Sequence, residues 1–106
     1  LIGIGVERYH ADYGRLEKTF YMPDGESLVV PLEHPPLPVA DAFCAAGVEG
    51  AIRAIQRGEI DYPRFLTRTA EAGCVGYFVL LAGQQAQYFG RRGEVHVEPF
   101  PAPASA

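Results

Sequence analysis

Three ionisable residues at alternating positions, Arg8, His10 and Asp12, offer the clearest chemistry in this sequence. Successive side chains of a β-strand point to opposite faces, so this spacing places all three on one side of a strand. There His10 could act as a general acid or base, with Asp12 orienting it and Arg8 holding an anionic substrate. The alternative is a strand near a sheet edge, where charges face solvent and discourage further pairing. A His–Asp pair at this spacing is unspecific, which favours the alternative.

The strand that carries these residues is the first of three expected strands, at 6–13, 18–22 and 27–32. Between the second and third lies PDGE, residues 23–26. This is the chemistry of a tight turn, because Pro presets φ, Asp tolerates the bend and Gly supplies a positive φ. The stretch therefore predicts a three-stranded unit joined by hairpins.

The same pattern recurs 68 positions later. Residues 5–32 align with 73–100 without a gap and give six identities in 28 positions. The identical positions are turn glycines and strand residues: Gly5/Gly73, Tyr9/Tyr77, Gly25/Gly93, Glu26/Glu94, Val29/Val97 and Pro31/Pro99. We interpret the two stretches as an internal duplication.

Two helices are expected between the repeats, at about 41–57 and 62–72, after a stiff connector, HPPLP. The first has an apolar stripe at Val48, Ala51, Ile52 and Ile55, and the second has one at Phe65, Leu66 and Thr69. Asp61 is expected to cap the second helix, with Pro63 in its first turn and Gly73 as its stop.

These elements predict an α+β fold over one domain, residues 1–100. Two related three-stranded units form a mainly antiparallel sheet, packed by the two central helices. By the repeat, LIGIG at 1–5 is expected to be the tail of an equivalent helix whose start is missing. The alternative is that residues 1–4 begin a strand. The Pro/Ala-rich segment 101–106 is expected to be a disordered tail.

The repeat also suggests where function differs between the two units. The counterparts of Arg8, His10 and Asp12 are Gly76, Phe78 and Leu80. We therefore expect the second strand to be sealed in the core and the first to remain polar. The aromatic pairs at 20–21 and 88–89 each send one ring to either face of the sheet. Filling of the core is the favoured role of these rings, and an exposed ring marking a contact surface is the alternative, which makes Tyr21 a further contact candidate.

Composition excludes several classes of function. A net charge of −4, with Arg91-Arg92 as a short basic run, argues against nucleic-acid binding, and no apolar run suits a membrane span. Cys44 and Cys74 lie in apolar settings, where reduced buried thiols are expected, so cytoplasm is the expected compartment. We expect no metal or cofactor, because no ligand spacing is present. His96 is expected to point to solvent if it shares a face of its strand with Glu98.

The segments GVERYHADYGRLEKTFYMPDGE and GVEGAIRAIQRGEIDYPRFLTRTAEAGCVGYFVLLAGQQAQYFGRRGEVHVEPFP resemble the bacterial domain-of-unknown-function family 1398. Its members are often labelled phage-envelope-like. The most specific segments are GVERYHAD, in which the family pattern is GVERYxxD, then GEIDYPRFL, and AGCVGYFV followed by YFGRRGE. The resemblance implies a small α+β fold built by duplication. It implies no reaction, cofactor or catalytic residue.

The leading functional hypothesis is a small binding or protein-interaction module without catalysis. It would contact a protein or small molecule through Arg8, His10, Asp12 and Tyr21. An enzyme that uses His10 and Asp12 as an acid–base pair is the alternative, and a phage-associated structural protein is the third hypothesis. Exposed strand edges also suggest a homodimer.

Overall fold

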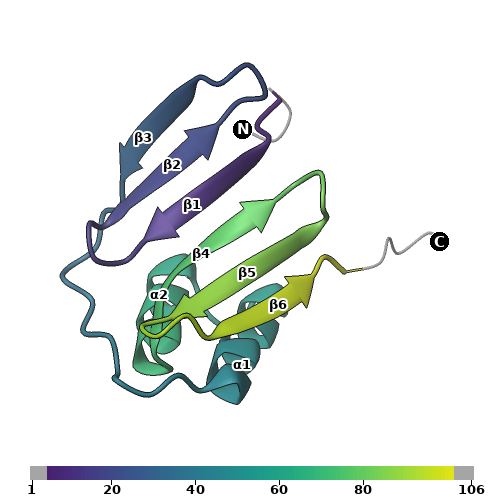
Figure 1. The fold of residues 1–106 in the computed structure, drawn as a ribbon. Coiled ribbons are helices and arrows are strands. Elements are labelled where there is room, and N and C mark those ends of the chain that lie inside the picture. The colour runs from purple at the N-terminus through teal and green to yellow at the C-terminus, as the bar shows by residue number, and fades with distance from the viewer. Residues whose placement is uncertain (1–4, 102–106) are drawn as a thin grey trace.

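Alternating polar and apolar residues fold both repeats into antiparallel meanders in the computed structural model, which describes residues 5–101. The elements in chain order are β1 (Arg8–Asp12), β2 (Glu17–Tyr21), β3 (Ser27–Pro31), α1 (Ala45–Gln56), α2 (Tyr62–Glu71), β4 (Cys74–Leu80), β5 (Gln85–Gly90) and β6 (Val95–Pro99). All strands join one antiparallel sheet, with both helices beside β4–β6 (Figure 1). The predicted α+β class is confirmed.

The sheet has the strand order β3-β2-β1-β4-β5-β6, so β1 and β4 lie at its centre. The edge strands are β3 and β6. The interpretation of Arg8, His10 and Asp12 as residues of a strand near an edge is therefore wrong. Their strand is hydrogen-bonded on both sides, and another reason is needed for its ionisable residues.

The two meanders have the same register wherever their strands pair regularly, and a β-bulge between Cys74 and Gly76 at the start of β4 is the exception among the strand pairs of residues 5–101. In the first, Tyr9 pairs with Phe20, and in the second Tyr77 pairs with Tyr88, each residue lying 68 positions later. Positive φ angles recur at the same offset, at Gly5 and Gly73, Leu16 and Gln84, and Gly25 and Gly93. These matches are what a tandem repeat requires, while common ancestry of the two units remains a prediction.

The pairing of the two central strands, β1 and β4, is centred on two residues that are equivalent in the repeat. His10 lies opposite Phe78, its own counterpart in the repeat. A local two-fold axis perpendicular to the sheet therefore passes between these two residues, and it relates the meanders to each other. Such an axis maps each face of the sheet onto itself, so residues at equivalent positions share a face.

Both helices begin at a side-chain cap. Cys44 Sγ accepts a hydrogen bond from the Gly47 amide at 3.3 Å, so α1 begins at Ala45 rather than near residue 41 as predicted. The earlier residues are held in an extended connection, because the Cys44 amide donates to the Ala72 carbonyl at 2.7 Å. Asp61 caps α2 as predicted, accepting from the Arg64 amide at 3.0 Å.

The core lies between the helices and one face of the sheet, which we call the helix-side face. Its buried residues include Ala11, Tyr13, Val48, Ala51, Ile52, Phe65, Leu66, Ala70, Cys74, Tyr77 and Tyr88. Ile55, predicted for the α1 stripe, is only partly buried, while Ala54 is buried. Cys44, predicted to be buried, is exposed because it caps a helix end, and both cysteines are free thiols.

The opposite face of the sheet, which we call the open face, carries no helix. Arg8, His10 and Asp12 lie on it by strand alternation, beside Phe78 and Leu80 of the neighbouring β4. Phe78 and Leu80 are half-buried. The expectation that these counterparts would be sealed in the core is therefore wrong, since the two-fold axis keeps equivalent residues on one face.

Candidate functional site

A cleft of about 560 Å³ opens on the open face, where β1 ends and β4 begins. This volume falls in the range of small-molecule sites. The lining is mainly apolar and contains three charged or ionisable residues, His10, Asp12 and Arg91. The other lining residues are Gly14, Leu37, Pro38, Val39, Val75, Gly76 and Phe89. The sheet supplies the floor, and the extended connection between β3 and α1 supplies one wall.

His10 is held at the middle of the cleft floor by aromatic stacking. Its ring lies against Phe78, with centroids 4.5 Å apart and planes inclined by 28°. A Cβ added to Gly76 would lie 3.4 Å from His10 Nε2, so the glycine leaves space beside this nitrogen. Within residues 5–101 neither ring nitrogen has a hydrogen-bond partner, which leaves both available to a ligand.

Asp12 lies in the same cleft, but its carboxylate stabilises the turn that follows β1. Its Oδ1 accepts hydrogen bonds from the amides of Gly14 at 2.9 Å and Arg15 at 3.2 Å, an Asx turn that ends β1. No hydrogen bond joins Asp12 to His10 in the part of the chain that the structure describes. The predicted acid–base pair thus shares a cleft without the contact that would orient the imidazole.

Arg91 brings a cationic group to the cleft from the turn after β5. Its Nη2 donates to the Val39 carbonyl at 2.7 Å, which fixes the connection as a wall. The neighbouring Arg92 binds both carboxylate oxygens of Asp41, at 3.0 and 3.1 Å. The two arginines therefore clamp the connection, and the remaining N–H groups of Arg91 stay beside the cleft.

The other two predicted contacts, Arg8 and Tyr21, form a separate pair on the open face. The Arg8 guanidinium carbon lies 4.2 Å from the Tyr21 ring centroid, and Arg8 also pairs with Glu7. Neither lines the cleft. The structure thus brings together His10 and Asp12, but it does not bring all four predicted residues into one site.

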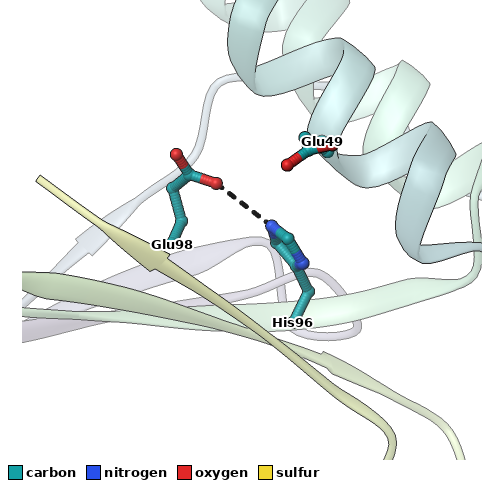
Figure 2. Close-up of side chains that lie close together, drawn as sticks. All are labelled: Glu49, His96 and Glu98. Carbon is teal, nitrogen blue, oxygen red and sulfur yellow. Dashed lines mark hydrogen bonds and ion pairs between the residues drawn. The ribbon is translucent and has the colours of Figure 1, made fainter. Parts of the chain in front are cut away.

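A second cluster of ionisable groups joins β6 to α1 on the helix-side face. His96 Nε2 lies 3.1 Å from Glu98 Oε1, and Glu49 of α1 approaches both (Figure 2). The side chains of His96 and Glu98 are 17% and 12% exposed. His96 and Glu98 do share a face, but the prediction that His96 points to solvent is wrong, because this face of β6 lies toward α1.

These three side chains could supply metal ligands, since their ligand atoms lie within 4.8 Å of one another. Arg53, however, already neutralises the carboxylates. Its guanidinium donates to Glu98 Oε2 at 2.7 Å and to Glu49 Oε2 at 3.4 Å. A divalent cation here would face this guanidinium, so the arrangement is better suited to an ion-pair clasp between α1 and β6 than to a metal centre.

The clasp shifts the ionisation of Glu98. Burial raises the pKa of this carboxyl, but the hydrogen bonds from Arg53 and His96 outweigh burial, and the pKa is lowered overall. The tyrosines of the core show the opposite pattern. Burial raises the pKa of Tyr62 to about 12, although its hydroxyl is only 2.6 Å from that of Tyr77. These hydroxyls are neutral structural groups.

Sequence reasoning missed half of the cleft. In the sequence, Arg91 stands out only as part of a basic pair too short for nucleic acid, and Phe89 only as one of an aromatic pair. No local pattern places the connection at 37–39 beside His10. A usable signal was the Pro-rich connector, whose stiffness lets it serve as a wall.

None of the helices in residues 5–101 is both long and apolar enough to cross a membrane. A family model described as a protein of unknown function (DUF1398) matches residues 1–99. No curated protein matches the chain.

Proposed function

We propose that this chain, which belongs to the DUF1398 family, is a non-catalytic binding module whose open-face cleft holds a small organic anion. The observation that carries the proposal is the composition of the cleft. The lining combines the Arg91 guanidinium and the His10 ring, whose nitrogens have no hydrogen-bond partner among residues 5–101, with the apolar side chains of Phe89 and Val75. Apolar walls with a few convergent polar groups are typical of ligand sites.

The charge balance of the cleft supports an anionic ligand. Asp12 is the carboxylate in the lining, and two backbone amides already hold its Oδ1. Arg91 gives one hydrogen bond to Val39 and keeps further donors. A carboxylate on an aromatic or alicyclic ring would pair with Arg91 and His10 while its ring covers Phe89.

The alternative of an enzyme acting through His10 and Asp12 has less support. Both residues line one cleft, as an enzyme requires. Asp12 is committed to the turn, however, and it does not orient the imidazole. A cytoplasmic location agrees with the two free thiols, and the shared register of the meanders supports duplication of one ancestral unit.

Isothermal titration calorimetry with matched ligands tests the proposal. The probes are benzoate, phenylacetate and cyclohexanecarboxylate, each paired with its neutral amide. We expect at least one carboxylate to bind with one site per chain and about tenfold more tightly than its amide, since a charged hydrogen bond is worth about 1.5–3 kcal/mol before solvent screening. His10→Ala and Arg91→Gln should each weaken that binding.

Arg57→Gln is the matched control, because Arg57 lies at the end of α1, away from the cleft, with a side chain 63% exposed. It should leave the affinity unchanged. Binding that ignores the carboxylate, or an equal loss in Arg57→Gln and Arg91→Gln, would contradict the proposal. Size-exclusion chromatography of the same samples tests the phage-associated structural hypothesis, which requires assembly into large particles.

A further inference from the structure

The turn that ends β1 uses only one oxygen of the Asp12 carboxylate. Oδ1 accepts the hydrogen bonds from the amides of Gly14 and Arg15. Oδ2 has no hydrogen-bond or ion-pair partner among residues 5–101. Because Asp12 lines the open-face cleft, the cleft contains a hydrogen-bond acceptor as well as the nitrogens of His10 and Arg91.

The nearby ionisable side chains leave Oδ2 available. Arg15, the cation of the same turn, has its guanidinium bound to Glu17. His10 makes no hydrogen bond with Asp12 in the part of the chain that the structure describes. A ligand that donates a hydrogen bond to Oδ2 would therefore displace water rather than a residue of this part of the chain.

The two-fold axis of the sheet supplies an internal comparison for the cleft. It relates Gly76 to Arg8 and Phe89 to Tyr21, and in each meander the two residues are cross-strand neighbours. In the first meander the Arg8 guanidinium carbon lies 4.2 Å from the Tyr21 ring centroid, and the guanidinium pairs with Glu7. In the second meander the residue beside Phe89 is a glycine, which has no side chain to cover the ring.

The first meander thus shows which kind of group fits this position. A guanidinium is flat and carries N–H donors, so it can stack on an aromatic ring while it pairs with a carboxylate. In the cleft, Phe89 offers the ring. Val75 stands at the position equivalent to Glu7, so the carboxylate of the cleft is that of Asp12 instead. A flat ligand group with an N–H donor would satisfy both.

We propose that the ligand of the cleft is an aromatic acid with an amino group on its ring. The ring covers Phe89, the carboxylate pairs with Arg91 and His10, and the amine donates a hydrogen bond to Oδ2 of Asp12. The inference rests on the proposed function, which supplies the carboxylate half of the ligand. It adds the group that distinguishes one such acid from another, and it makes Asp12 the residue that determines specificity.

The spacing along β1 suits this ligand. His10 and Asp12 are two residues apart on one face of the strand, so their Cα atoms are about 6.6 Å apart. A benzene ring with a carboxylate at one end and an amine at the other spans a gap of this order. The meta and para isomers are both suitable probes, because the side chains extend from these positions at different angles.

Matched pairs of ligands test the inference by titration calorimetry with the full chain. The probes are meta- and para-aminobenzoate, each compared with the methylbenzoate of the same position. An amino group and a methyl group are similar in size, but only the amino group donates a hydrogen bond. At least one aminobenzoate should bind about tenfold more tightly than its methyl partner, because its amine gains a charged acceptor.

Asp12→Asn changes the oxygen that the ligand would use and keeps the turn. Asparagine retains a carbonyl oxygen for the amides of Gly14 and Arg15, while its NH₂ group replaces Oδ2 and cannot accept a hydrogen bond. The variant should bind the two acids with affinities within about twofold of each other. It should bind methylbenzoate at least as tightly as the wild type does, because a negative charge has been removed from the cleft.

Asp24→Asn is the matched control. Asp24 closes a similar turn by accepting a hydrogen bond from the Glu26 amide at 2.9 Å, but it does not line the cleft. This variant should keep the wild-type preference, and thermal melting checks that both variants fold. Amide NMR of the wild type gives a second measurement, in which aminobenzoate should shift Gly14 and Arg15 more than methylbenzoate does.

The outcomes separate this inference from the proposed function. Equal affinities of the wild type for the amino and methyl acids, with binding still weakened by Arg91→Gln, would overturn the inference and leave the proposed function standing. A preference for the amine that survives in Asp12→Asn would also overturn it. Failure of all four acids to bind would overturn both.

Discussion

The Arg53–Glu98 clasp gives a prediction that combines stability with pH. Glu98→Gln keeps the size of the side chain but removes the charge that pairs with Arg53. Hydrogen bonds to charged groups contribute about 1.5–3 kcal/mol. Because Arg53 is 39% exposed and partly screened by solvent, we expect a smaller loss, about 1–2 kcal/mol in the free energy of unfolding at neutral pH.

The loss should depend on pH in a defined direction. The folded state lowers the pKa of Glu98 below its ordinary value of 4.5. The charged clasp therefore contributes its full stability above pH 4.5, and this contribution disappears as the pH falls through the lowered pKa. The difference between wild type and Glu98→Gln should thus be constant near neutrality and should shrink in acid.

Urea unfolding curves at several pH values, followed by circular dichroism, measure this difference. For a domain near this size, 1 kcal/mol also corresponds to about 4–8 °C in Tm. Glu49→Gln is the control, since its carboxylate is 3.4 Å from Arg53 and 50% exposed, and it should cost less than about 0.5 kcal/mol. Equal costs for Glu98→Gln and Glu49→Gln, or a loss that persists undiminished in acid, would refute the clasp.

Two further predictions concern packing. Gly50→Ala should raise the free energy of unfolding by about 0.5–1 kcal/mol, because the new Cβ would meet only Arg68, at 3.7 Å. Gly47→Ala should stabilise the protein less or destabilise it, since its Cβ would lie 3.0 Å from the Cβ of Ala72. Thermal melting of both variants measures this difference, and an equal gain in the two would contradict the packing argument. Tyr13→Phe should cost about 1 kcal/mol because it removes the buried hydrogen bond to Thr69, and urea unfolding that shows no loss would contradict a contribution from that bond.

Local chemistry was enough to predict most of the elements. The PDGE turn, the Asp61 cap and the Pro63 start were read from residue types whose conformational preferences act within a few positions. The start of α1 was placed too early, because the segment before Ala45 is held by backbone hydrogen bonds to the end of α2. Such a tertiary tie has no signature in the local sequence.

The order of the strands in the sheet could not be predicted from local sequence patterns. The repeat predicted two equivalent units, but it did not say that β1 and β4 would pair with each other. That pairing puts His10 beside Phe78 and leaves both on the open face. His96 and Glu98 face α1 because the helices pack on their side of the sheet, which the sequence of β6 alone does not show.

The site could be predicted only in part, for the same reason. His10 and Asp12 were identified from their types and spacing, and they share the cleft. Arg91 enters it from a turn remote in sequence, and its role depends on the bond to Val39 that fixes the wall. The direction of the Asp12 carboxylate depends on the turn it closes.

The most direct test of the ligand-binding account is a two-dimensional amide NMR titration of the full chain with the tightest-binding carboxylate from the calorimetry. The account predicts saturable shifts for the amides around the cleft, at His10, Gly76, Phe89 and Arg91, and small shifts at β3 and α2. Shifts centred away from these residues, or the same pattern with the neutral amide at equal concentration, would contradict it.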